Sequence, residues 1–307
     1  MIDLLLLAVT ALTSVRDAYP ASSPDGSLIL FQSNRSGRQG LWVARPDGSN
    51  PRILFDEPKV GADPATPQWS PDGKRIVFAM RPAGATDENE SEIYAIDPDG
   101  SHLDRLTYAA GDDSHPHWSA DGKRIFFNSA RATPDLKADW GKQWIDIYSM
   151  AAAGSDVRRV TYCHAICTYP WPSPDGRWIV HRRVIHSPGY DWSQQSVPTN
   201  SEVFITSADG SSTRNLSSDA HFDGWPIWSP DGRWIVWASG RDGVANSAQL
   251  YRVHPDGSGL ERLTSGPFAH VQPNFAGPDA MLVYQEMEDG VAEIGGIARV
   301  SLPRAGQ

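Results

Sequence analysis

Apolar residues along this chain come in short runs, and a turn sequence or a polar loop follows each run. The run Arg75–Ala79 is rich in β-branched and aromatic residues and predicts a strand. It follows Pro71-Asp72-Gly73, a turn sequence in which Pro presets φ, Asp bonds its own backbone and Gly accepts a positive φ. Three further extended segments belong to the same unit: Pro67–Ser70, Glu92–Ile96 and Leu103–Thr107. The unit therefore predicts four short antiparallel strands.

This unit recurs six times, and each copy opens with a proline and carries a version of Trp-Ser-Pro-Asp-Gly. The opening prolines are 47, 49, 54, 56 and 47 residues apart: Pro20, Pro67, Pro116, Pro170, Pro226 and Pro273. A period of roughly 50 residues with strand-like content indicates a propeller or a solenoid. The long helical periodicity that a solenoid of this period needs is not found. The sequence therefore predicts an all-β, six-bladed β-propeller of four-stranded antiparallel blades.

Radial repetition favours one domain over residues 1–307. We expect the blades at about 18–56, 64–108, 113–162, 167–218, 223–265 and 271–302. The last repeat ends after its third strand, and Ala11–Ser14 resembles the end of a fourth strand, Arg262–Ser265. Residues 1–14 are thus expected to supply the missing strand and close the ring, which removes exposed edges.

A secretory signal is the other interpretation of residues 1–14. Leu4–Val9 would be its apolar core, although Asp3 stands where a signal carries Lys or Arg. Export would place the protein in the periplasm or outside the cell, whereas a closing strand without an upstream signal would leave it in the cytoplasm. Cys163 and Cys167 are the only cysteines; they can form a disulfide in an exported protein or stay free thiols.

Charge and hydropathy limit the classes of binding partner that we expect. The formal charge is −10, from 27 basic and 37 acidic residues, with no Lys/Arg cluster, so neither nucleic acid nor an acidic membrane surface is an expected partner. Leu4–Val9 is the longest apolar run and is too short to span a membrane. We expect a monomer.

Two long insertions separate the second and third strands of blades 3 and 4. They are Arg131–Trp144 and His186–Ser201. In a meander blade this loop lies on the same face as the loop that leads to the next blade, so both insertions are expected on one face. They carry aromatic residues suited to stacking on a sugar ring or an apolar side chain, or to packing on their own blades: Trp140, Trp144, Tyr190 and Trp192.

Two columns of residues are expected to surround the channel mouth on that face. Three positions before the opening prolines stand Asp17, Pro64, Asp113, Cys167, Asp223 and His270; one position before them stand Tyr19, Thr66, His115, Tyr169, Trp225 and Gln272. Together with His221 and the insertions, these columns supply the candidate ligand-binding residues: Asp113, His115, Tyr169, His221, Asp223, Trp225, His270, Gln272, Trp140, Tyr190 and Trp192. Aspartates at such positions also cap tight turns.

The succession of W-S-P-D-G, an I-V-F strand, I-Y, D-G and R-L-T resembles the repeats of TolB-like six-bladed propellers, also described as WD40-like or PD40 repeats. The family includes a periplasmic translocation protein, propellers that gate peptidases and a metal-dependent oligogalacturonate lyase. The resemblance implies the fold and leaves the activity open, because one fold hosts many functions. The chain has no G-x-S-x-G nucleophile elbow.

Histidines are the candidate metal ligands. His115, His117 and His270 could hold a divalent metal if their imidazoles converge, and the resemblance to the lyases implies a His-x-His pair, matched by His115 and His117. Asp112 stands where that resemblance implies a Gln ligand. Otherwise no cofactor is expected. In an enzyme, His115 or His270 would act as general base, and Arg182 and Arg183 would bind a substrate carboxylate.

The sequence as a whole favours a binding module that takes a protein or peptide, or a small polar or carbohydrate ligand, at the channel mouth. The alternative is a stand-alone enzyme, a metal-assisted lyase or hydrolase acting on a uronate-like carbohydrate. Converging histidines would favour the enzyme, and histidines spread over separate blades would favour the binding module.

Overall fold

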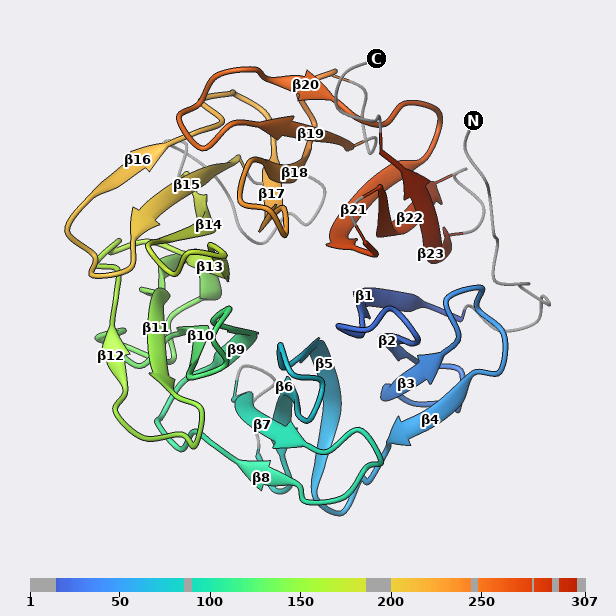
Figure 1. Cartoon of the computed structure of the whole chain (residues 1–307). Coiled ribbons are helices and arrows are strands. Elements are labelled where there is room, and N and C mark those ends of the chain that lie inside the picture. Colours follow the sequence, from blue (N-terminus) through green and yellow to red (C-terminus); the bar gives the residue numbers. More distant parts are fainter. Residues whose placement is uncertain are drawn as a thin grey trace.

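The computed structural model describes residues 15–85, 90–185, 200–243, 248–277, 279–288 and 293–302. Six antiparallel sheets surround a central axis in chain order, as Figure 1 shows. The described strands form five sheets of four strands and one sheet of three. The predicted six-bladed, all-β propeller is thus confirmed. The expected closing strand lies in residues 1–14, outside the described residues.

The strands follow the repeat. Blade 1 contains β1 (Asp17–Ser22), β2 (Ile29–Ser33), β3 (Gly40–Ala44) and β4 (Arg52–Phe55). Blade 2 contains β5 (Gly61–Trp69), β6 (Ile76–Pro82), β7 (Glu92–Ile96) and β8 (Asp104–Arg105). Blade 3 contains β9 (Asp113–Trp118), β10 (Arg124–Ser129), the 3-10 helix η1 (Trp140–Lys142), β11 (Asp146–Ala151) and β12 (Arg158–Arg159).

The second half repeats this order. Blade 4 contains β13 (Cys167–Pro172), β14 (Trp178–Val184), β15 (Ser201–Ser207) and β16 (Thr213–Asn215). Blade 5 contains β17 (Asp223–Trp228), β18 (Ile235–Ser239), β19 (Gln249–Val253) and β20 (Glu261–Arg262). Blade 6 contains β21 (Ala269–Phe275), β22 (Ala280–Glu288) and β23 (Glu293–Ser301). Within these ranges no helix is long and apolar enough to cross a membrane.

The hydrophobic core lies between the blades rather than at the centre of the ring. Alternate strand residues face the neighbouring blade, so each blade interface has its own cluster of buried side chains. Phe78 packs with Leu30 between blades 1 and 2, and Leu282 packs with Phe31 between blades 6 and 1. Packing between the last and first blades therefore completes the ring of interfaces.

The Ser-Pro-Asp-Gly turns are held by one repeated set of hydrogen bonds. In blade 2 the Ser70 hydroxyl donates to Asp72 Oδ1 at 2.7 Å and accepts from the Arg75 N–H at 2.9 Å. The bond from Ser70, with that from the Lys74 N–H, lowers the pKa of the Asp72 carboxyl. The same serine-to-aspartate bond recurs in four other blades.

Successive turns also touch each other. A Cβ added at Gly73 would lie 3.7 Å from Cδ of Pro24, and the same contact links Gly122 to Pro71 and Gly232 to Pro174. The series is interrupted where blade 3 has Ala120 in place of the proline, and Gly176 of blade 4 has no such neighbour within 4 Å. A cavity of about 520 Å³ lies there, lined by residues of both turns.

Ala120→Pro is expected to stabilise the protein by about 0.4–1 kcal/mol, because the exposed turn position matches the proline of the other repeats and the unfolded chain loses freedom. Urea unfolding measures the change. Ala152→Pro is the matched control: the Ala152 N–H donates to Lys123 O at 2.9 Å, so the same substitution there is expected to destabilise. Equal effects at both positions would contradict this explanation of the turn.

Candidate functional site at the channel mouth

A ring of six residues, one from each blade, closes the central channel. They are the residues directly before the opening prolines: Tyr19, Thr66, His115, Tyr169, Trp225 and Gln272. All six have left-handed backbone, with φ between 50° and 57°. Each lies in an inner strand where the pairing register shifts, as at a β-bulge. The bulge turns these side chains out of the sheet and into the channel. We call this set the channel ring.

The ring side chains contact one another across the axis. The hydroxyls of Tyr19 and Tyr169 are 3.0 Å apart and hydrogen-bonded. The His115 ring lies 3.9 Å from that of Tyr169, which lies 5.9 Å from Trp225. The cavity left inside the ring is only about 60 Å³. The channel is therefore closed at this level. A ligand larger than this cavity would bind on the ring rather than pass through it.

Polar side chains of the neighbouring strands hold the ring in place. Gln272 Oε1 accepts from the Tyr19 N–H at 2.9 Å, and Gln32 Oε1 accepts from the Thr66 N–H at 3.1 Å. Asn128 Oδ1 lies 2.8 Å from Nδ1 of His115, while Asn128 Nδ2 donates to Ser114 Oγ. With Asn128 in this orientation, Nδ1 of His115 carries the proton and Nε2 is left as an acceptor.

The ring is electrically neutral. Burial, followed by the nearby Arg182 cation, lowers the pKa of His115 to about 3. Burial and the neighbouring Tyr169 raise the pKa of Tyr19 well above its ordinary value. Near neutral pH the imidazole is therefore uncharged and the phenol keeps its proton.

Arg182 lies directly beside the ring. Its Nε donates to Thr168 Oγ1 at 3.1 Å, and its guanidinium carbon is 5.2 Å from the centre of the Tyr169 ring. Its neighbour Arg183 lies on the other face of β14, where it packs on Phe204 and donates to Cys163 O at 3.3 Å.

The acidic candidates lie outside the channel. Asp113 and Asp223 are completely buried and face arginines of their own blades, Arg131 at 2.6 Å and Arg241 at 3.3 Å. Asp17 pairs with Arg35 in the same way. These carboxylates are thus engaged in ion pairs within the blade.

The other histidines are dispersed. The His117 ring lies 3.9 Å from that of Trp171 in a tilted contact, and its Nδ1 is bonded to Trp118 O. His270 is buried beside Gln249. His221 is exposed and bonded to Asp219, and His164 stacks on Trp144. Within the described ranges, no group of three or more His, Cys, Asp or Glu side chains is arranged to hold a metal.

The insertion of blade 3 folds onto the scaffold. Leu136 packs against a cluster formed by blades 3 and 4, and the Thr133 hydroxyl donates to Trp144 O at 2.9 Å. Trp140, in η1, keeps 36% of its surface exposed. Cys163 and Cys167 are joined in a disulfide next to this insertion. Tyr190 and Trp192 lie outside the described residues.

The supporting residues Gln32, Asn128 and Thr168 were not expected from the sequence. The sequence does contain a signal for Gln32 and Asn128. Each stands three positions after an isoleucine at the first or second position of its second strand, as Arg182 does. In blades 1, 3 and 4 the side chain at this position contacts a ring residue. A polar residue at this position thus predicts a side chain that contacts the channel ring.

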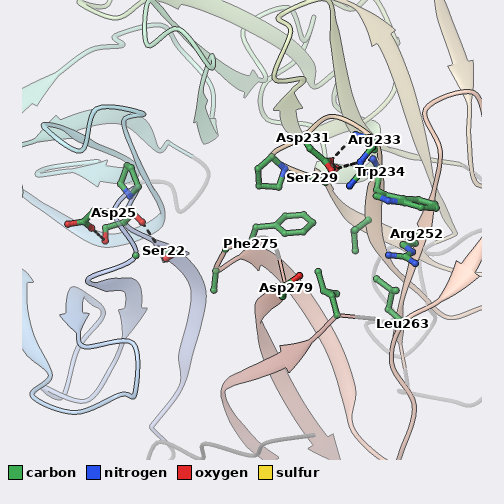
Figure 2. Close-up of a pocket in the computed structure, with 18 residues that line it drawn as sticks. Ser22, Asp25, Ser229, Asp231, Arg233, Trp234, Arg252, Leu263, Phe275 and Asp279 are labelled. Atoms are coloured by element: carbon green, nitrogen blue, oxygen red, sulfur yellow. Dashed lines mark hydrogen bonds and ion pairs between the residues drawn. The ribbon is translucent and has the colours of Figure 1, made fainter. Parts of the chain in front are cut away.

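A larger cavity, of about 590 Å³, lies on the turn face between blades 5, 6 and 1 (Figure 2). It exists because the turn of blade 6 is shorter: five residues separate Phe275 from its partner Met281, whereas six separate Trp69 from Ile76. Figure 2 shows Phe275 between the turns that carry Asp25 and Asp231. The arginines in its wall are paired, Arg233 with Asp231 and Arg252 with Glu261. No uncompensated cation therefore marks this cavity among the described residues.

Six antiparallel blades around a channel closed by one side chain from each define the protein as a six-bladed β-propeller. Residues 58–187 match the family model of the TolB beta propeller domain, PD40. Over these residues the chain is similar to the TolB-like propellers.

Relatives of this chain include an uncharacterized protein, Atu1656, of Agrobacterium fabrum, 28% identical over 73% of this chain and 64% of its own length. Dipeptidyl-peptidase 5 of Porphyromonas gingivalis is 25% identical over 86% of this chain and 42% of its own length. The chain thus spans less than two thirds of either relative.

Two solved structures share the fold. TolB from Acinetobacter baumannii aligns with a TM-score of 0.64 at 23% identity and covers 85% of this chain and 57% of its own. An oligogalacturonate lyase in complex with manganese aligns with a TM-score of 0.58 at 14% identity and covers 91% and 77%. At these identities the likeness concerns the fold alone.

Proposed function

We propose that this chain is a TolB-like binding module that engages a protein or peptide segment, or a small polar ligand, on the channel ring. The observation that carries the proposal is the left-handed backbone of all six ring residues. A non-glycine residue in this region costs on the order of 1–2 kcal/mol. Such strain persists where the surrounding structure enforces it, and it is concentrated at functional sites.

The position of the histidines supports binding rather than metal-assisted catalysis. His115 and His117 belong to blade 3 and His270 to blade 6, and their Nδ1 atoms are bonded to Asn128, Trp118 and Gln249 respectively. The described residues thus offer no converging imidazoles that would favour the lyase alternative. Metal content of the wild-type protein beside His115→Ala tests that alternative: stoichiometric metal lost in the variant would replace the binding proposal by the enzyme.

We further propose that the protein works outside the cytoplasm. The Cys163–Cys167 disulfide supports this location, because such bonds persist in oxidising compartments and are rare in the cytosol. The resemblance to the periplasmic TolB family points in the same direction.

The experiment that tests the binding site is affinity capture from an extracytoplasmic fraction with three proteins: wild type, Trp225→Ala on the ring and Trp234→Ala on the turn face. Removal of a central aromatic contact typically costs 2 kcal/mol or more, so the ring variant should bind its partner at least about 10-fold more weakly. The Trp234→Ala control should capture the same species as wild type. Loss in the control, or full capture by Trp225→Ala, would move the site away from the ring.

A further inference from the structure

Among the described residues, Arg182 has no acidic partner, unlike four other arginines that pair with buried aspartates. Arg35, Arg131, Arg159 and Arg241 each pair with a buried aspartate of their own blade. Arg182 makes one hydrogen bond, from Nε to Thr168, and stacks over Tyr169. Its two terminal nitrogens have no hydrogen-bond partner among the described residues. A partly buried guanidinium in this state is free to receive an anion.

The position of Arg182 in the repeat shows that the charge is specific to the site. The equivalent side chains in four other blades are Gln32, Ala79, Asn128 and Ala238. Gln32 and Asn128 support the ring through hydrogen bonds, and the two alanines are buried in apolar clusters. Among these five blades only blade 4 has a charge here. The blade scaffold therefore does not require a cation at this position.

The surroundings of Arg182 suit a single negative charge. The imidazole of His115 is neutral, so it adds no second cation. The Tyr19 and Tyr169 hydroxyls share one hydrogen bond, so one phenolic proton remains to donate elsewhere. The N–H groups of Tyr19 and Thr66 are already bonded to Gln272 and Gln32. One guanidinium and one phenol fit a monoanion better than a phosphate, which requires more donors.

We propose that Arg182 and the Tyr19–Tyr169 pair form a carboxylate-binding site on the channel ring. The planar guanidinium presents parallel N–H donors that match the two oxygens of a carboxylate. The faces of Tyr169 and Trp225 would pack on the group that carries the carboxylate. This inference rests on the proposed function and names the chemistry of its ligand. The carboxylate could come from a peptide or from a sugar acid.

The test is a titration of the purified protein with two carboxylates, galacturonate and N-acetylglutamate. The methyl ester of galacturonate and the dimethyl ester of N-acetylglutamate are the uncharged controls. Side-chain ¹H–¹⁵N spectra follow the Arg182 Nε–H signal. We expect a saturable shift with a Kd of about 1 mM, typical of one charge-assisted contact with little other interface. The esters should shift it at least about 10-fold less. Preference for galacturonate would indicate a sugar-acid ligand, and preference for N-acetylglutamate a peptide ligand.

Two variants complete the test. Arg182→Gln should lose carboxylate binding, and it should raise the Tm by about 2–4 °C because an uncompensated charge is removed. Arg183→Gln is the matched control on the other face of β14 and should bind like wild type. Arg182→Lys keeps the positive charge but loses the parallel N–H donors of the guanidinium, so it should bind carboxylates several-fold more weakly. This variant keeps the proposal testable if Arg182→Gln does not fold.

Binding that survives in Arg182→Gln, or esters that bind as well as acids, would overturn the carboxylate site. This result is separable from the capture experiment. Carboxylate binding lost in Arg182→Gln, together with capture that is insensitive to Trp225→Ala, would sustain the anion site and reject the ring as the partner site. The opposite combination would sustain the ring as the partner site and reject the anion site.

Discussion

Asp146→Ala is expected to destabilise the protein by about 3–5 kcal/mol, the largest effect of the substitutions proposed, because it leaves a partly buried cation and two hydrogen-bond donors without their acceptor. The Asp146 carboxylate is completely buried. It pairs with Arg159 at 2.5 Å and accepts hydrogen bonds from the Thr161 hydroxyl at 2.9 Å and the Cys163 N–H at 2.7 Å. One carboxylate therefore joins the outer strand of blade 3 to the disulfide loop that leads into blade 4.

Urea unfolding of wild type and variant measures this loss. The control is Asp156→Asn in the same blade. Asp156 accepts from Arg124 at 2.8 Å, but its side chain is 46% exposed, and Asn tolerates its positive φ of 53°. Because exposed ion pairs contribute about 0–1 kcal/mol, the control should change stability by no more than that. Similar losses in both variants would show that burial of Asp146 is not the source of its effect.

Acidification is expected to destabilise the fold through buried neutral histidines. Burial lowers the pKa of His181 to about 4, and the pKa values of His117 and His270 are lowered to about 4 for the same reason. The unfolded chain binds these protons near pH 6.5, before the folded protein does. Each histidine therefore removes up to about 1.4 kcal/mol of stability per pH unit between pH 6.5 and about 4. Asp112 offsets the contribution of one histidine. Burial raises the pKa of its carboxyl to about 6, so the folded protein binds this proton before the unfolded chain does.

His181→Gln isolates this contribution. The His181 side chain is 1% exposed, and its Nε2 is bonded to the Thr206 hydroxyl at 2.9 Å, a contact that glutamine can approximate. At pH 8 the difference in unfolding free energy between wild type and variant reports only the changed contact. Between pH 6.5 and 4 that difference should move by about 3 kcal/mol in favour of the variant. A difference that stays constant over this range would refute the assignment of a depressed pKa to His181.

The fold was predictable because short segments of each repeat determine their own turns and strands. Pro71-Asp72-Gly73 specifies a turn, and the run that follows it specifies a strand, so six copies specify six blades. The place of Tyr169, Trp225 and Gln272 in the channel was likewise predictable from one proline-based alignment. That these residues bind a ligand stays a prediction.

What the sequence could not show depends on pairings across the sheet. Asp113 and Asp223 were expected at the mouth, yet each faces an arginine eighteen positions later in the same blade. That Arg182 has no acidic partner among the described residues is equally invisible in a sequence that carries 27 basic and 37 acidic residues. The turn-face cavity depends on one residue missing from the sixth repeat, and only the pairing register reveals that difference.

The identical backbone at the six ring positions has a consequence for how such a protein can change over time. The same left-handed bend supports Tyr, Thr, His, Tyr, Trp and Gln, so the bend does not depend on which side chain it carries. A gene that grew by copying one blade would thus have acquired six equivalent ring positions, and the side chain at each could be replaced independently of the others. New recognition properties could then arise by substitution in one blade, while the interfaces that hold the ring together stay as they were.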